Sequence, residues 1–296
     1  MKTLIPVIFV NPVEFHGPHL PLSTDYDISL GLFRDMEKAL TKTHPEIQFL
    51  LRPPIQKGCN PATGPGSERT NMAVLSDMLR KECENILDEM KEYLPRHVLF
   101  MTFHGAPRHA AAIESAIEFL RTKNIQAYNP FNLSLIKLRD YNPEWVKPLL
   151  HLIPDEAYRE HWLHHLPEDF HGGTFESSLV LYYAPDKVKD YKNVPDCPDR
   201  SPGLKWKSPI PLLWAFQKLI GISAPKREWE IAIDALHWEK SANYPGYTGS
   251  PKNASGELGE KVSAILLKDY LACFHEILSG KRVSPKPILQ WTLHFN

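Results

Sequence analysis

The sequence predicts an α/β fold in which helices cover both faces of a mostly parallel sheet. Two observations support this prediction. Short apolar runs typical of buried strands recur along the N-terminal part of the chain, and each run is followed by a loop and an amphipathic helical pattern. Ligands of such sheets bind beyond the carboxyl ends of the strands, so polar residues that follow the apolar runs are the first candidates for a functional site.

The first expected strand and helix are joined by a polar loop that contains prolines. Residues 4–10 are apolar and rich in β-branched side chains, which predicts a buried strand. Residues 24–43 carry apolar side chains at helical spacing, which predicts a helix. Thr24 and Asp27 fit a capping box at its start, with Thr24 as the N-cap.

The same order is repeated twice further along. Residues 47–51 form a second short apolar run, and residues 75–90 carry the apolar stripe of an amphipathic helix. Residues 97–102 predict a third strand, and residues 113–120 form the apolar face of the helix that follows it.

The C-terminal half is less regular. A histidine- and glycine-containing block at residues 171–178 precedes an apolar stretch, and residues 258–273 have the pattern of a last amphipathic helix. Residues 184–214 are rich in proline and indicate a long surface excursion rather than a domain linker. We therefore expect one domain over residues 1–296.

Composition excludes several classes of protein. The chain has 296 residues with 34 basic and 35 acidic side chains, a formal net charge of -1. This balance predicts no binding to nucleic acid or to an anionic membrane surface, and no apolar stretch approaches the roughly 20 residues of a membrane span. The four cysteines show no paired spacing, which is typical of reduced thiols in a cytoplasmic protein.

Metal-ligand residue types follow the expected strands. Glu14 and His16 are two positions apart in an extended segment, so their side chains point the same way, and Asp25 can fold back beside them. We expect His104 to arrive at the same rim from a later strand end. Carboxylates and neutral imidazoles are ligands for zinc, manganese and iron.

Four blocks of the sequence resemble, in order, the motifs of the creatininase (creatinine amidohydrolase) family. The segment from Glu14 to Asp25 is similar to the signature E-x-H-G-x-H-L-P-x-x-T-D. The other blocks are Gly64-Pro65-Gly66-Ser67 for the PGT loop, Thr102-Phe103-His104-Gly105-Ala106 for N-G-H-G-G or N-G-H-Y-E, and His171-Gly172-Gly173-x-x-Glu176-Ser177-Ser178 for H-A-G-x-x-E-T-S.

This resemblance implies a three-layer α/β/α sandwich with a mostly parallel central sheet and a metal centre at the strand ends. It implies a metal-dependent amidohydrolase that cleaves a non-peptide C–N bond in a small-molecule amide, of the cyclic amide or formamide type. It also implies a homo-oligomer, often a hexamer. The cofactor would be a divalent metal, two ions per chain, with Zn²⁺ first and Mn²⁺ or Fe²⁺ as alternatives.

The resemblance also assigns ligands. Glu14, Asp25 and His104 would hold one ion, and His16 and Asp25 the second, so that Asp25 is the bridge. Some family members take a further ligand from the last residue of N-G-H-Y-E, but Ala106 stands there in this chain. By the same resemblance, Glu176 is our candidate to complete the second site, and we expect it to arrive from a later strand end.

We assign His171 and Glu176 to catalysis. A hydroxide on the metal would attack the substrate carbonyl, and His171, by its position, would deliver a proton to the leaving nitrogen. The glycines after His171 also allow a role in backbone shape alone. A lactone or ester is an alternative substrate for the same centre.

Each candidate also has a structural interpretation. Asp25 suits the first turn of a helix, and His104 alone suits a capped strand end. His19 is out of phase with the ligands, and we expect it to fix the loop or orient a ligand. We interpret His161, His164 and His165 as a solvated helix face.

Departures from the family pattern favour a second hypothesis. Thr102, Phe103 and Pro107 replace family residues beside His104, and we expect these changes to line the substrate pocket. Arg108 and His109 suit either an anion-binding element or a solvated helix start. The alternative function is a non-catalytic member of the fold that binds metal or a small ligand in a structural or regulatory role.

Overall fold

The computed structural model describes residues 2–60, 62, 64–91, 95–169, 171–197, 214–239 and 245–294. In these residues the chain forms a four-stranded sheet of order β2-β1-β3-β4, and all three strand pairings are parallel. The strands are β1 (Thr3–Phe9), β2 (Ile47–Leu51), β3 (His97–Met101) and β4 (Gln126–Tyr128).

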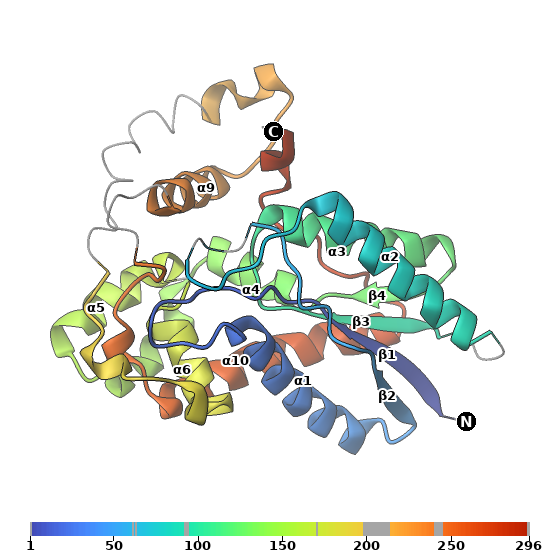
Figure 1. Cartoon of the computed structure of the whole chain (residues 1–296), viewed down its shortest axis with the longest axis horizontal. Coiled ribbons are helices and arrows are strands. Elements are labelled where there is room, and N and C mark those ends of the chain that lie inside the picture. Colours follow the sequence, from blue (N-terminus) through green and yellow to red (C-terminus); the bar gives the residue numbers. More distant parts are fainter. Residues whose placement is uncertain are drawn as a thin grey trace.

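Helices cover both faces of this sheet, so the predicted three-layer α/β/α sandwich is confirmed. Helices α1 (Thr24–Thr43) and α10 (Gly256–Leu278) lie on one face, and α2 (Met72–Glu89) and α3 (Pro107–Thr122) lie on the other (Figure 1). The further α-helices are α4 (Phe131–Arg139), α5 (Glu156–His165), α6 (Thr174–Tyr183) and α9 (Lys226–Glu239).

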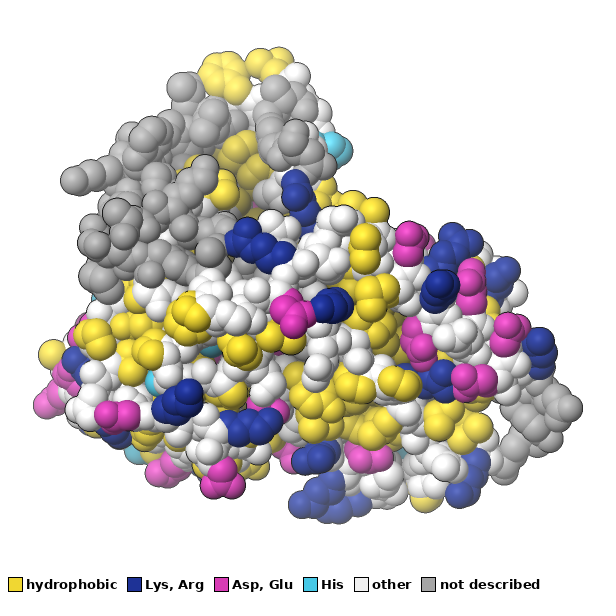
Figure 2. Space-filling model, viewed as in Figure 1, with side chains coloured by type: hydrophobic (Ala, Val, Ile, Leu, Met, Phe, Trp, Pro, Cys, Tyr) yellow, Lys and Arg dark blue, Asp and Glu magenta, His cyan; other side chains and the backbone are white. Residues whose placement is uncertain are grey.

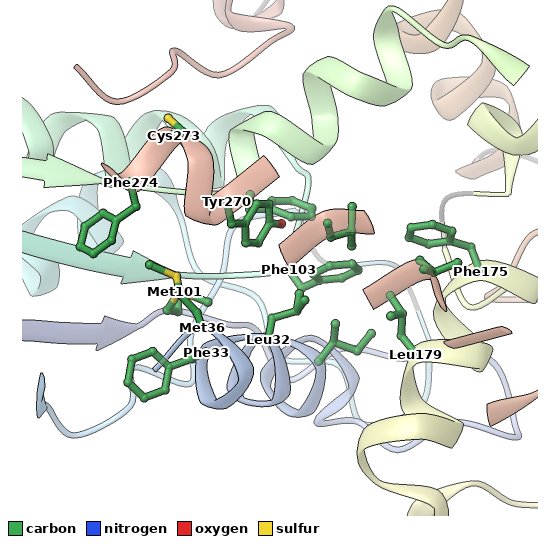
Figure 3. Packing of buried hydrophobic residues seen from close by; sticks show 14 of the residues in the cluster. Leu32, Phe33, Met36, Met101, Phe103, Phe175, Leu179, Tyr270, Cys273 and Phe274 are labelled. Atoms are coloured by element: carbon green, nitrogen blue, oxygen red, sulfur yellow. The ribbon is translucent and has the colours of Figure 1, made fainter. Parts of the chain in front are cut away.

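The alternation of β1 side chains explains why the strand is apolar throughout. Ile5, Val7 and Phe9 pack into the cluster with α1 and α10, whereas Ile8 and Val10 pack into the cluster with α2 and α3. A parallel strand that is covered on both faces needs apolar residues at every position. Figure 3 shows the first of these clusters, with side chains from α1, α6 and α10 converging beside β3.

Helix α6 packs tightly against α10. A Cβ atom at Gly259 would lie 1.9 Å from the Ser178 carbonyl oxygen, so only glycine allows this approach of the two backbones. Helix α6 also contacts α1. These contacts fix the position of α6 beside the sheet, although no strand leads into it.

Local details differ from the prediction at the start of α1. Ser23, not Thr24, is the N-cap, and its hydroxyl donates to Asp27 Oδ2 at 2.8 Å. Asp27 also pairs with Lys187 Nζ at 2.6 Å, because the chain returns there after α6. The prediction placed the cap one residue late, since Ser and Thr are both good caps and stand side by side.

Part of the proline-rich stretch 184–214 lies outside the described residues, namely 198–213. Residues 184–197 run along the surface in short 3-10 turns. On the face shown in Figure 2, acidic and basic side chains are interspersed. Among the described residues no helix combines the length and apolar character that crossing a membrane requires.

Candidate metal centre

The first loop brings Glu14, His16 and Asp25 together. Glu14 and His16 follow β1 in a segment without regular secondary structure, and Asp25 lies in the first turn of α1. His16 Nε2 is 3.3 Å from Asp25 Oδ1 and 4.0 Å from Glu14 Oε2. The His16 Nδ1–H donates to the Glu14 carbonyl at 3.1 Å, which leaves Nε2 as the atom that can bind a metal.

His104 approaches the same carboxylates from the end of β3. Its Nδ1 lies 2.8 Å from Glu14 Oε2 and 3.6 Å from Asp25 Oδ2. Its Nε2–H donates to the Cys59 carbonyl at 2.9 Å, so Nδ1 is the nitrogen with an available lone pair. The expected delivery of His104 from a strand end is therefore confirmed.

Glu176 completes the cluster, but from a helix. It lies in the first turn of α6, with Oε2 3.7 Å from His16 Nε2 and 2.6 Å from the Gly172 N–H that donates to it. The expectation that Glu176 follows a strand is wrong. The apolar stretch after it forms a helix because it packs on α10 rather than in the sheet.

Asp169 fixes the start of α6 and was not identified from the sequence. Its buried carboxylate accepts the N–H groups of Thr174 and Phe175 at 2.9 and 3.2 Å, and the Trp162 indole N–H at 2.8 Å. An acidic residue shortly before a helix was the available signal, but the helix itself was not predicted.

In the part of the chain that the structure describes, three sets of side chains could hold a metal ion, and two of them share Asp25. In each set the potential ligand atoms all lie within 4.8 Å of one another: Glu14, Asp25 and His104 in the first, His16, Asp25 and Glu176 in the second, and Glu14, His16 and His171 in a third. All three sets are buried. Three of their atoms, Glu14 Oε2, His16 Nε2 and Asp25 Oδ2, have no hydrogen-bond partner among the described residues. Buried polar atoms without partners are costly, and a divalent cation would satisfy all three.

The charges of the cluster favour a cation. Burial opposes a charge on His16, but Asp25, Glu14 and Glu176 outweigh it and raise the pKa of His16 to about 10. Burial likewise opposes a charge on His104, and Glu14 overcomes it and raises that pKa to about 9. Burial raises the pKa of Glu176 to about 8. Protons therefore balance the carboxylates when no metal is bound, and a metal would displace them.

His171 lies directly beside this cluster. Its ring stacks on His16 with centroids 4.1 Å apart, and its Nε2–H donates to the Phe15 carbonyl at 2.9 Å. Burial, and then the charge of His16, lower the pKa of His171 to about 3. The next residue, Gly172, has φ +58°, and a Cβ there would lie 2.6 Å from the His16 carbonyl oxygen, so the backbone shape also requires glycine.

His19 fixes two loops to each other, as its position in the signature suggested. Its Nε2 lies 3.0 Å from the Gly172 carbonyl and 2.8 Å from Ser177 Oγ. The loop that carries His16 is thereby joined to the turn that carries His171.

Two of the substituted side chains near His104, those of Thr102 and Phe103, are buried in the interior. The Phe103 ring is in the hydrophobic core, 4.9 Å from the Phe131 ring, and it points among residues of α1 and α10 (Figure 3). Thr102 Oγ1 lies 3.1 Å from His109 Nε2 and accepts the His104 backbone N–H at 3.2 Å. Arg108 is exposed, as expected at a solvated helix start. His109 is fully buried, so this interpretation is wrong for His109.

Asn11 is a second residue that the sequence analysis missed. Its buried side chain accepts the Phe103 N–H at 3.0 Å and donates to Ser29 Oγ at 3.0 Å. It therefore joins the ends of β1 and β3 to α1, directly behind the two ligand loops. A lone asparagine after an apolar run gave no specific signal.

Other candidates lie away from the cluster. His161, His164 and His165 are exposed on α5, as expected of a solvated face, although His164 and His165 pair with Glu160 and Glu168. A surface groove of about 550 Å³ lies between α2 and the loop around Pro54, and none of its lining residues belongs to the two ligand sets.

Fold and site together define an α/β/α protein with a buried carboxylate–imidazole centre at the carboxyl ends of parallel strands. Comparison with protein families identifies it further: the family model for creatininase, described as creatinine amidohydrolase, matches residues 3–274. The chain belongs to the creatininase family. At the family level it is related to amidohydrolases.

Solved structures support the same fold. A putative creatinine amidohydrolase from Bacteroides fragilis NCTC 9343 is similar with a TM-score of 0.58 and 20% identity, covering 94% of this chain and 90% of that chain. A mutant creatininase of the Zn-Zn type has a TM-score of 0.59 and 16% identity, with coverage of 93% and 90%. A structure titled creatininase Mn has a TM-score of 0.54 and 17% identity, with coverage of 93% and 91%. A comparison with curated proteins gave no match.

Proposed function

We propose that this protein is a metal-dependent amidohydrolase that cleaves a non-peptide C–N bond in a small cyclic amide or formamide. The observation that carries the proposal is the pair of buried ligand sets sharing Asp25, in a chain of the creatininase family. Glu14, Asp25 and His104 would hold one divalent ion, and His16, Asp25 and Glu176 the other.

The donor set fits two divalent ions. Three carboxylates with two neutral imidazoles carry three negative charges, so two divalent ions together with one hydroxide ion would make the site neutral, whereas a single divalent ion would leave it negative. The mixture of oxygen and imidazole ligands suits Zn²⁺ first, with Mn²⁺ and Fe²⁺ as alternatives. When bound, the ions would polarise the substrate carbonyl and lower the pKa of a water molecule to roughly 7.

Within this site, His171 is our candidate for delivering a proton to the leaving nitrogen. Its Nε2–H is committed to the Phe15 carbonyl, so Nδ1 is the atom that can take up and release a proton, and its low pKa makes the protonated ring a strong donor and the neutral ring a weak acceptor. The water oxygen adds to the carbonyl carbon, the C–N bond breaks, and Nδ1 delivers a proton to the leaving nitrogen. A formamide gives a carboxylic acid and an amine, whereas a cyclic amide gives one molecule that carries both groups. Such proton transfer contributes about 10²–10⁴ in rate.

The alternative, a non-catalytic metal- or ligand-binding protein, loses one of its supports. It rested on altered residues next to His104, and Phe103 packs in the core instead of facing a substrate. Both ligand sets are complete, which favours the enzyme.

The test is elemental analysis of the purified protein, followed by a screen of cyclic amides, formamides and lactones. We expect metal in the purified protein, hydrolysis of at least one amide, loss of activity with a chelator, and recovery with Zn²⁺ or Mn²⁺. Less than about half an ion per chain, with no hydrolysis after metal is added, would contradict the proposal. Hydrolysis of lactones alone would replace the amide by an ester as the substrate.

We also propose a cytoplasmic location and assembly into a homo-oligomer, for which the family resemblance implies six chains. None of the four cysteines forms a disulfide, and Cys59, Cys83 and Cys273 are buried. Light scattering on the purified protein would measure the mass of the assembly, and a mass of about 34 kDa, that of one chain, would contradict the oligomer.

A further inference from the structure

The cluster is buried, and its two most exposed members are histidines. Among the ligand-type residues, His16 and Asp25 are 1% exposed, whereas His104 and His171 are 6% and 8% exposed. A substrate would therefore approach past the two histidines, and the side chains that flank them would contact it.

Trp238, in the last turn of α9, flanks His171. The centroids of its ring and the His171 ring are 5.1 Å apart, with the planes at 59°. Its indole N–H donates to the Tyr247 carbonyl at 3.1 Å. Tyr247 is itself fixed, because its hydroxyl donates to the Pro195 carbonyl at 2.8 Å and its ring packs edge-on against His19. The indole is thus held in a defined orientation beside the cluster.

The indole is not part of the core of the protein. Trp238 is half-buried and belongs to neither of the two large clusters that cover the sheet. Figure 1 shows α9 apart from the three layers. The helix is joined to the body at its other end, where the buried Glu228 accepts from Arg139 and from the Leu289 N–H. The contact of Trp238 with His171 therefore places a large apolar ring where a substrate would approach.

We propose that Trp238 is a specificity-determining residue whose indole forms one wall of the substrate site and selects planar cyclic amides over small open-chain ones. This inference rests on the proposed hydrolase function. A flat ring can stack on the indole, whereas an open-chain formamide offers little surface for such contact. The metal centre would contact the amide group of either substrate in the same way. The contact with the Trp238 indole would therefore decide which substrate binds more tightly.

The experiment compares W238A and W238F with the control W214F, all loaded with zinc. Trp214 is a matched control, because it lies in the same part of the chain, is 42% exposed and also donates its indole N–H to a carbonyl at 3.1 Å, that of Ala224. Calorimetry would measure the binding of 2-pyrrolidinone, a planar cyclic amide, and of N-methylformamide. Zinc content and the unfolding midpoint of each variant would be measured alongside.

We expect W238A to weaken the binding of 2-pyrrolidinone about tenfold and that of N-methylformamide less than about twofold, with zinc content unchanged. W238F retains a ring and should fall between W238A and the wild type, and W214F should match the wild type. Equal weakening of both amides, or no weakening, would overturn the role of Trp238. If zinc-loaded wild type bound no 2-pyrrolidinone, the role of Trp238 would be overturned as well, whereas the proposed metal centre would stand. Protein that binds no zinc would overturn the proposed function and this inference together.

Discussion

Asp25 is the residue on which both ligand sets depend. Its Oδ1 faces His16 and its Oδ2 faces His104, so its two oxygens point to different sets. His16 belongs to the second set but not to the set of Glu14, Asp25 and His104. The two residues are equally buried, so their substitutions are a fair comparison.

We predict that Asp25→Ala loses both ions, whereas His16→Ala loses mainly one. Removing the shared carboxylate takes one ligand from each set, and removing His16 takes a ligand from one. Zinc per chain, measured by elemental analysis after dialysis against a fixed free zinc concentration, distinguishes the two. Equal loss in the two variants would argue against Asp25 as the bridge.

For single residues, the sequence predicted which side chains meet, because their positions relative to the strands determine where they lie. Glu14 and His16 follow an unmistakable strand at a spacing that points both inward, and His104 follows another. Phe103 was misplaced because the motif shows which residue changed but not which way its side chain turns. Asn11 was missed because its role depends on three elements meeting.

Helix α6 shows where prediction of elements fails. Its residues are apolar and aromatic with two adjacent serines, and by periodicity alone such a stretch is as compatible with a strand as with a helix. The packing of Gly259 against Ser178 favours the helix over a strand. This contact joins residues far apart in the chain, so local sequence patterns do not reveal it. Strand β4, which has only three residues, and helix α9 were likewise not predicted.

Because α6 carries Glu176, its start should matter for both stability and metal binding. We predict that Asp169→Ala lowers the free energy of unfolding by about 2–4 kcal/mol, since it leaves buried N–H donors without acceptors. Asp155 is a matched control: it caps α5 by accepting two backbone N–H groups, at 3.0 and 3.2 Å, but it is exposed. Asp155→Ala should cost about 1 kcal/mol.

Urea unfolding of the two variants, with zinc content measured on the same samples, checks this prediction. Asp169→Ala should also lower zinc occupancy, because Glu176 loses its fixed position, and Asp155→Ala should not. If the two substitutions cost the same and neither affects zinc, then Asp169 does not position the ligand.

For the whole molecule, the cluster joins parts of the chain that are otherwise held only by packing. Its ligands come from the segment between β1 and α1, from the end of β3, and from α6. The unfolded chain cannot hold five such groups together, so metal binding adds directly to folding stability. The sheet and its two helical layers could be predicted from local patterns, whereas this connection across the molecule depends on the tertiary fold.

We predict that removing metal with a chelator lowers the melting temperature and that zinc restores it. A site occupied at about 1,000 times its dissociation constant adds about 4 kcal/mol, and for a chain of this size each kcal/mol shifts Tm by roughly 2 °C. One site should therefore contribute about 8 °C. Magnesium at the same concentration should contribute far less, because imidazole ligands do not suit it. Calorimetric scans of the wild type and of Asp25→Ala would measure this shift in Tm. If zinc raised the Tm of Asp25→Ala as much as that of the wild type, the stabilising ion would bind elsewhere.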